Sequence, residues 1–320
     1  MFSDLLTVFS LSQPARPLNG FRGASDGGRC AQAPIGVGAW TTIPLSEYPI
    51  GHIAGLLSLR IYFCIFTENI SFTMKDKTYQ YDDPFKAMAR AHQFSYRENI
   101  LGITNDERNP QVILTAEASK AGLNFCEEYR ELIRQNMPSK KYTAAALCSN
   151  MLRSEHIPYN IFTPMLLDKE ATRMLFCKLV DKDIAEITDI KIEYAGEPDK
   201  RPEYLNDRTS FDAYVQYKMA DGTEGGIGIE VKYTEKEYPL GGEEKNKIEN
   251  TSRYHMMTSN SHYYTNDLDI KRFIKDHHLR QIWRNHILGY SMMQKGDIQK
   301  FHHIHLYPAG NIHFQKKAIP

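Results

Sequence analysis

The sequence has few cysteines, and their placement argues against a metal site or a disulfide framework. The five are odd in number, and no two stand in a Cys-x-x-Cys spacing. They are Cys30, Cys64, Cys126, Cys148 and Cys177. A secreted disulfide scaffold or a structural zinc site normally needs paired, closely spaced cysteines. We therefore expect reduced, buried thiols in a cytoplasmic protein.

A long apolar run is also missing. The best candidate, Ile53–Phe66, is too short to cross a bilayer and contains Arg60, and the start lacks the basic residues of a secretory signal. Basic and acidic residues both number 39, so the net charge is zero. We therefore expect no membrane partner. The total charge does not mark a basic nucleic-acid binder, although a local positive cleft is compatible with it.

Lysine is absent from residues 1–73 and frequent from Lys75 onward. This stretch is rich in Gly, Pro and Ser, and it holds neither a helical nor a strand period for long. We hypothesise that the working protein starts near Met74 and that residues 1–73 are a disordered upstream extension. A flexible arm or a small targeting segment is the alternative. The rest divides into a region of helices, 74–153, and a core, 154–320.

The chain before the central segment is predicted to be mainly helical. Asp83 followed by Pro84 is typical of a helix start, and Asp168 is a plausible N-cap. Pro158 and Pro164 are predicted to break the chain between these helices. A later segment alternates apolar and polar residues, as a strand does. The helices expected are 84–99, 116–137, 141–153 and 168–180, and the strand is 187–194.

Residues 209–235 contain two alternating runs on either side of Asp221-Gly222, which is a strong hairpin pattern. If the loop runs from Met219 to Thr223, then Lys218 pairs with Glu224. Counting inward then puts Asp212 opposite Glu230, and residues opposite each other lie on one face with Cβ atoms about 5 Å apart. Lys232, two residues beyond Glu230, shares that face.

An Asp, a Glu and a Lys on one small surface suit phosphodiester hydrolysis. Two close carboxylates can hold Mg²⁺, which polarises a phosphate and lowers the pKa of a bound water. A lysine can orient or deprotonate the water and offset negative charge. Gly228 is expected to leave the site face open beside Glu230. The alternative is a solvated hairpin face with a cross-strand ion pair and no function.

The order of elements and motifs resembles the PD-(D/E)XK, restriction-endonuclease-like nuclease superfamily over roughly residues 85–315. Asp212 matches the motif aspartate, although Phe211 precedes it in place of proline, and Glu230-Val231-Lys232 matches the (D/E)xK element. The phrases at 229–235, 153–156 and 281–286 resemble a poorly characterised bacterial branch. The resemblance implies an α/β fold: a mixed four- or five-stranded sheet flanked by helices, with an N-terminal helical region.

The resemblance also implies further site residues. Such nucleases often add an acid from the first helix; Glu155 ranks first, with Glu170 and Glu193 as alternatives. A later helix often supplies a Gln or Arg near the phosphate, so Gln281 is a catalytic candidate, and Arg280 and Arg284 are candidates for nucleic-acid contacts. A solvated face is the alternative for them. The apolar stripe at 279–293 predicts that Trp283 and His286 belong to the core.

The following strand, 301–307, contains three histidines. Their spacing puts only His303 and His305 on one face, away from His302, and no acid or cysteine in the sequence pattern completes a metal set with them. We therefore do not expect a histidine metal site there.

The function implied is Mg²⁺-dependent cleavage of DNA, with Mn²⁺ as a substitute, in restriction, defence or repair. Asp212 and Glu230 would hold the metal. Related nucleases often dimerise to cut both strands, so a homodimer stays open. One alternative is an inactive nuclease fold that binds nucleic acid or a protein partner. Another is a small-molecule enzyme or a structural domain whose hairpin charges are incidental.

Overall fold

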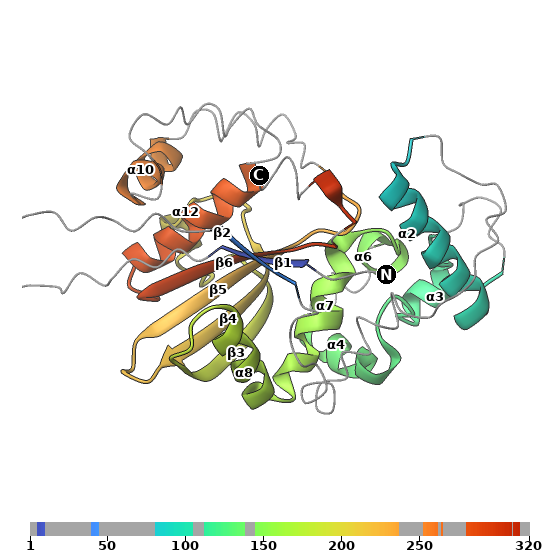
Figure 1. Ribbon diagram of the computed structural model, residues 1–320, viewed down its shortest axis with the longest axis horizontal. Coiled ribbons are helices and arrows are strands. Elements are labelled where there is room, and N and C mark those ends of the chain that lie inside the picture. The colour runs from blue at the N-terminus through green and yellow to red at the C-terminus, as the bar shows by residue number, and fades with distance from the viewer. Residues whose placement is uncertain are drawn as a thin grey trace, which may run out of the picture.

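A mixed β-sheet lies at the centre of the computed structural model, with helices on both faces and a group of helices beside one end (Figure 1). The structure describes residues 5–9, 40–44, 81–104, 112–137, 145–236, 252–261, 264, 280–308 and 310–313. The expected mixed α/β fold, with helices N-terminal to the sheet, is confirmed.

The central hairpin joins β4 (Phe211–Met219) and β5 (Glu224–Val231). Gly222 in the turn has φ +86°, which glycine adopts without steric cost. Lys218 pairs with Glu224 and the ladder continues to the pair of Ala213 with Ile229. The predicted loop and register are therefore confirmed, and the next register position sets Asp212 opposite Glu230.

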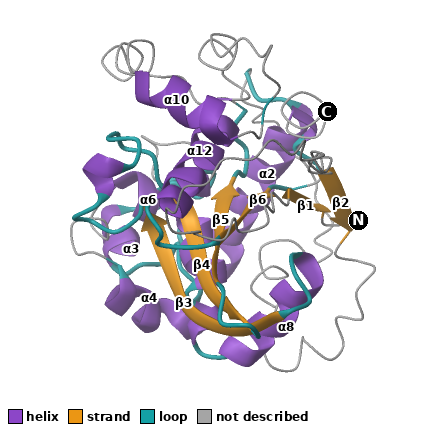
Figure 2. Cartoon of the chain, turned by 90° about the vertical axis from the view of Figure 1, so that its left-hand side faces the viewer, coloured by secondary structure: helices purple, strands orange, loops and turns teal. Residues whose placement is uncertain are grey.

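The sheet has the strand order β2-β1-β6-β5-β4-β3. β6 (Lys300–Leu306) runs parallel to β5, and β3 (Ile184–Tyr194) runs antiparallel to β4 (Figure 2). These four strands form the expected sheet. Two more, β1 (Leu5–Phe9) and β2 (Trp40–Pro44), extend it beyond β6, which makes six where four or five were predicted. Most of residues 1–73 lies outside the described residues, so the hypothesis of an upstream extension stays a prediction.

Two long helices cover the faces of the sheet (Figure 1). α8 (Lys169–Leu179) packs on β3, and its predicted N-cap is confirmed by the Asp168 carboxylate, which accepts from the backbone N–H of Ala171 at 2.9 Å. α12 (Arg280–Gln294) packs on β6 and β5. On its outer side α12 contacts α10 (Ser252–Ser261).

Aromatic rings fill the face of β5 that carries Glu230. A Cβ on Gly228 would lie 2.5 Å from the ring of Phe211 and 3.0 Å from that of Phe301. The expectation that Gly228 leaves this face open is therefore wrong, because glycine is needed here to admit the two rings. Phe211 thus packs in the α12 cluster and not with Ala213 on the opposite face.

The N-terminal helices are shorter than predicted. α2 (Pro84–Ser95) begins as expected, with the Asp83 carboxylate accepting from the N–H of Lys86 at 2.9 Å, and continues as a π-helical turn, η2 (Tyr96–Ile100). The single helix expected over 116–137 is wrong. Gly122, at φ +73°, separates two helices. These are α3 (Ala116–Lys120) and α4 (Arg130–Asn136), with η3 (Glu127–Tyr129) leading into the second.

The segment that leads into the core also differs from its prediction. Of the helix expected over 141–153, the structure describes α6 (Ala145–Ser149), while 138–144 lies outside the described residues. Pro158 and Pro164 begin helical turns instead of breaking the chain, since a first-turn proline costs no intrahelical bond. The short elements are η4 (Ser154–His156), α7 (Ile157–Phe162), η5 (Pro164–Leu166) and η6 (Arg201–Glu203).

Two further expectations concern thiols and membranes. In the described part of the chain, Cys126, Cys148 and Cys177 carry free thiols, and only Cys148 is buried. Cys30 and Cys64 lie outside the described residues. None of the described helices combines the length and hydropathy that a membrane span requires.

Candidate active site

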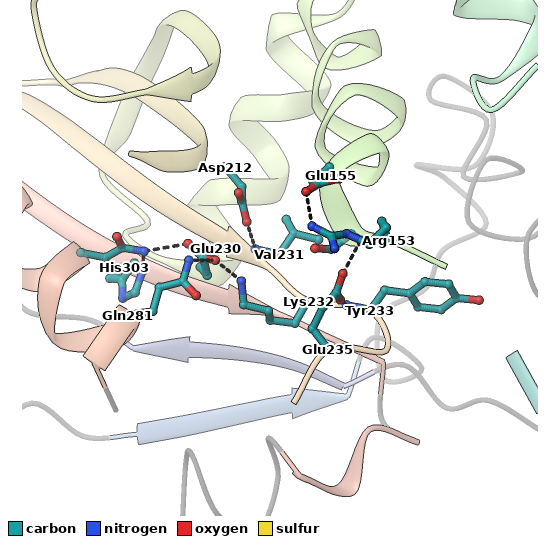
Figure 3. Close-up of polar contacts among 12 residues, drawn as sticks. Arg153, Glu155, Asp212, Glu230, Val231, Lys232, Tyr233, Glu235, Gln281 and His303 are labelled. Atoms are coloured by element: carbon teal, nitrogen blue, oxygen red, sulfur yellow. Dashed lines mark hydrogen bonds and ion pairs between the residues drawn. The ribbon is translucent and has the colours of Figure 1, made fainter. Parts of the chain in front are cut away.

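Asp212, Glu230 and Lys232 meet where the β4–β5 ladder ends (Figure 3). The last ladder pair is Ala213 with Ile229. One residue further, the Asp212 carboxylate accepts a hydrogen bond from the backbone N–H of Val231 at 2.7 Å. The aspartate side chain therefore serves as the acceptor where a backbone carbonyl of β4 would normally do so. At this point the ends of β4 and β5 are connected through the Asp212 carboxylate.

Glu230 is completely buried, and its two oxygens are held by three donors. Lys232 Nζ and Gln281 Nε2 both donate to Oε1, and Asn285 Nδ2 donates to Oε2 at 2.8 Å. An isolated carboxylate would be costly in such a place, so the ammonium and the two amides are what makes its burial tolerable. Figure 3 shows Lys232 and Gln281 directed at Glu230 from the strand end and from α12.

The charged side chains in this group alter one another's pKa values. Burial, and then the adjacent Glu230 carboxylate, raise the pKa of Asp212 well above its ordinary value, although Lys232 works against this. Burial opposes the charge on Lys232, but Glu230 and Asp212 outweigh it and the Lys232 pKa is raised. Lys232 is therefore a stable cation here, while two acids share one positive partner. A further positive charge would relieve their repulsion.

The donor atoms fit a small, hard divalent ion. Asp212 is only partly buried and Glu230 lies beside it, so carboxylate oxygens are the available ligands, as Mg²⁺ prefers. A buried amide oxygen, Gln281 Oε1, lies outside this pair of carboxylates and accepts no hydrogen bond among the described residues. In the part of the chain that the structure describes, no group of three or more His, Cys, Asp or Glu side chains is placed to hold a metal. Two carboxylates suffice for an ion that keeps several waters.

Glu155 lies beside this group and is paired elsewhere. Its Oε1 accepts from Arg153 at 2.5 Å. The loop that carries it is tied to the catalytic strand by Glu235, which accepts from the N–H groups of Ser154 at 2.7 Å and Tyr233 at 2.9 Å (Figure 3). The structure thus ties the loop that carries Glu155 to the strand end, and Glu155 makes no hydrogen bond to Asp212, Glu230 or Lys232.

The two alternative acids differ from each other. Glu170 pairs with Arg173 on the exposed side of α8, as a first-turn acid commonly does. Glu193 is the last residue but one of β3 and has φ +56°, and its charge contributes to raising the Asp212 pKa. Of the three acids considered, Glu193 is therefore the one that acts electrostatically on Asp212.

The candidates on α12 separate into two groups. Gln281 reaches Glu230 and belongs to the site. Arg284 forms a buried ion pair with Asp207 at 2.9 Å and donates to Thr209 at 2.9 Å, so the structure does not bring it to the acidic group. Arg280 is also buried, at 2% exposure. The alternative of a solvated face is wrong. Nucleic-acid contacts by Arg280 and Arg284 stay predictions.

Trp283 and His286 lie in the core, as expected. Trp283 donates to the Thr258 hydroxyl at 2.9 Å, and His286 Nδ1 lies 3.0 Å from the hydroxyl of Tyr264. Burial lowers the pKa of His286 to about 3. A neutral, enclosed imidazole of this kind packs as an aromatic ring.

One polar residue of the site, Asn285, was not predicted from the sequence. The position of His303 and His305 beside Glu230 was not predicted either. Asn285 binds Glu230 and lies 3.4 Å from His303 Nε2. His303 and His305 share a face, as predicted, with ring centroids 4.6 Å apart, but an acid does accompany them, because Glu230 is the register partner of His305. The sequence pattern that could have identified Asn285 is its spacing of four residues from Gln281, which places both side chains on the same side of a helix.

A family model described as the PD-(D/E)XK nuclease superfamily matches residues 80–319, which is more than half of the chain. No curated protein and no solved structure matches this chain. The match spans the N-terminal helices, strands β3 to β6 of the sheet and the strand ends where Asp212, Glu230 and Lys232 meet. This chain belongs to the PD-(D/E)XK nuclease superfamily.

Proposed function

We propose that the protein is a metal-dependent nuclease that hydrolyses phosphodiester bonds in DNA. Superfamily membership supports phosphodiester chemistry, a nucleic-acid substrate and a divalent metal in general terms. The observation that carries the proposal is the junction of Asp212, Glu230 and Lys232 at the strand ends. A structural hairpin would not need two acids and a lysine enclosed there, because burying them costs free energy.

The three residues have separate tasks in this proposal. Asp212 and Glu230 hold Mg²⁺, or Mn²⁺ in its place, which when bound polarises the phosphate and lowers the pKa of a water. Lys232 stays protonated because the neighbouring carboxylates raise its pKa. We therefore assign it to offsetting the negative charge that develops on the phosphate oxygens.

Cleavage assays test this proposal. The full chain would be incubated with supercoiled DNA, linear DNA and RNA, with Mg²⁺, Mn²⁺ or EDTA. We expect metal-dependent DNA cutting that falls at least about a hundredfold in Asp212→Asn and Lys232→Met. Lys236→Ala is the matched control, because Lys236 lies four residues on and pairs with Asp83 at 2.7 Å on the surface.

Two outcomes would contradict the proposal. DNA binding by the parent without cutting of any substrate would favour an inactive nuclease fold that binds nucleic acid. Equal cutting by the parent and both site variants would place the activity elsewhere.

A further inference from the structure

Two side-chain amides, one helical turn apart on α12, donate hydrogen bonds to the Glu230 carboxylate. Gln281 donates to Oε1 and Asn285 to Oε2. We propose that Asn285 is a positioning residue that fixes Glu230 for the divalent metal, whereas Gln281 is the releasable member of the pair. This inference rests on the proposed function and adds a residue to it.

The hydrogen-bond arrangement distinguishes the two amides. Oε1 of Glu230 receives both Lys232 and Gln281, so it keeps a charged partner when Gln281 leaves. Oε2 receives Asn285 as its donor. A carboxylate has about four lone-pair sites, so losing one of two donors on Oε1 is tolerable. Losing the donor on Oε2 leaves a buried oxygen unsatisfied and the carboxylate free to turn.

The surroundings of Asn285 hold its side chain in one orientation. Asn285 is completely buried, while Gln281, in the first turn of α12, is only partly buried. The Asn285 amide also lies 3.4 Å from Nε2 of His303. Its NH₂ group thus faces two acceptors, the carboxylate and the imidazole, and turning the amide over would set its oxygen against the carboxylate.

His303 supports the amide from behind. It is completely buried, and its ring meets His286 edge-on at 4.9 Å and His305 edge-on at 4.6 Å between centroids. A ring enclosed in this way has little room to turn, so the nitrogen that faces Asn285 is held in place. The chain Glu230–Asn285–His303 therefore links the acid on β5 to β6 through α12. Outer partners of metal-holding side chains commonly orient them in this manner.

Gln281, in contrast, is placed so that it can change its hydrogen-bond partner. Its Oε1 is buried and accepts no hydrogen bond among the described residues, as is also true of Oδ1 of Asn285, so the two amides differ in their NH₂ groups. The NH₂ group of Gln281 donates to Glu230 and, in the described part of the chain, has no second acceptor of the kind that His303 provides for Asn285. A partly buried amide whose NH₂ group has a single partner can exchange its contact with Glu230 for a contact with a water or a phosphate. Asn285 has no such freedom, because its NH₂ group is engaged by Glu230 and His303.

Calorimetric titration of the full chain with Mn²⁺, without DNA, tests the inference. Asn285→Ala removes the donor, and Asn285→Leu removes it while keeping a similar side-chain volume. We expect both to weaken Mn²⁺ binding about tenfold to a hundredfold. Gln281→Ala should bind Mn²⁺ nearly as the parent does and lose cleavage. Ser291→Ala is the control, since Ser291 is buried on the same helix and its hydroxyl donates to the Ile287 carbonyl.

The outcomes separate the inference from the proposed function. A parent that binds no Mn²⁺ and cuts no DNA would overturn both. A parent that binds Mn²⁺ and cuts DNA, with a folded Asn285→Leu that binds Mn²⁺ equally well, would overturn the positioning role alone. Thermal melting without metal identifies folded variants. Weakened Mn²⁺ binding in Asn285→Leu with unchanged binding in Ser291→Ala would support the inference.

Discussion

The carboxylate of Asp212 accepts the backbone N–H of Val231, one residue beyond the last ladder pair of β4 and β5. The acid therefore stabilises the strand junction through a hydrogen bond and strains it through its charge. Burial and Glu230 raise its pKa, which means that the ionised form is less stable in the folded chain than in the unfolded one. That cost begins as the pH rises above the unfolded value of about 4 and grows until the pH has passed the raised folded value.

Asp212→Asn should separate these two effects. Asparagine keeps an oxygen for Val231 and loses the charge. We expect cleavage to fall at least about a hundredfold, because a metal ligand is lost. We also expect a higher melting temperature than the parent in EDTA at pH 7, and a smaller stabilisation by Mn²⁺. A lower melting temperature in EDTA would show that the charge does not strain the site.

Glu235 provides a second prediction, because it ties the Arg153–Glu155 loop to the strand end that carries Lys232. Both of its oxygens accept backbone N–H groups, from Ser154 and Tyr233. In Glu235→Gln one end of the side chain becomes a donor and faces an N–H group. We expect a loss of about 1–3 kcal/mol in the free energy of unfolding and a drop in cleavage of about tenfold.

Urea unfolding and cleavage rates would measure both effects. Glu224→Gln is the matched control at the far end of the same hairpin, where Glu224 pairs with Lys218 at 3.5 Å on the surface. An exposed pair of this kind contributes about 0–1 kcal/mol. Equal behaviour of the two variants would contradict the role given to Glu235.

The site could be predicted from the sequence where the evidence was local. The period of two and the Asp221-Gly222 turn determine the β4–β5 register, and the register sets Asp212 opposite Glu230. Glu230, Lys232 and Gln281 then follow from motif order. The helix start at Pro84 and the N-cap at Asp168 are local as well. These features depend on neighbours within a few residues, so one sequence contains them.

The rest depends on contacts between distant segments. α12 is covered by α10 on one side and by the sheet on the other, so Arg280, Arg284 and Asn285 are buried although they are polar. An apolar stripe predicts one buried face and cannot show that the opposite face is covered too. His303 meets Asn285 only because β6 runs parallel to β5. Phe211 turns to the α12 face because Gly228 leaves room for its ring.

Arg284 offers a third prediction, which decides between a phosphate contact and a structural ion pair. Its pair with Asp207 is nearly inaccessible, with side-chain exposures of 5% and 6%. Breaking a buried pair from one side leaves an uncompensated charge. We expect Arg284→Ala to lower the free energy of unfolding by about 3–5 kcal/mol. The dependence of DNA binding on salt, measured in the Lys232→Met background, should not change.

A phosphate contact would give the opposite pattern. Loss of one arginine on a phosphate lowers the slope of log affinity against log salt by about one, with little effect on folding. The double variant Arg284→Met with Asp207→Leu is informative as well. It removes both charges, and we expect it to be more stable than Arg284→Ala alone.

The buried histidines give the last prediction, a loss of stability in mild acid. Burial lowers the pKa of His156 and of His302 to about 4. Near His302, Asp181 raises this pKa and Lys300 lowers it, and both are smaller effects than burial. A histidine with a lowered folded pKa contributes stability that is complete above its unfolded pKa, near ~6.5, and is lost as the pH falls towards the folded value.

The expected window is therefore between about pH 6.5 and pH 4, with each such histidine contributing a slope of about 1.4 kcal/mol per pH unit. Urea unfolding at several pH values measures the slope. His302→Leu removes one titrating group from the side of the sheet away from Glu230, where His302 lies near Tyr217. We expect it to lower the slope of the unfolding free energy against pH by the contribution of one histidine. Cleavage at pH 7 should be unchanged. An unchanged slope would mean that His302 is hydrated, because only a solvated imidazole keeps the same pKa on folding.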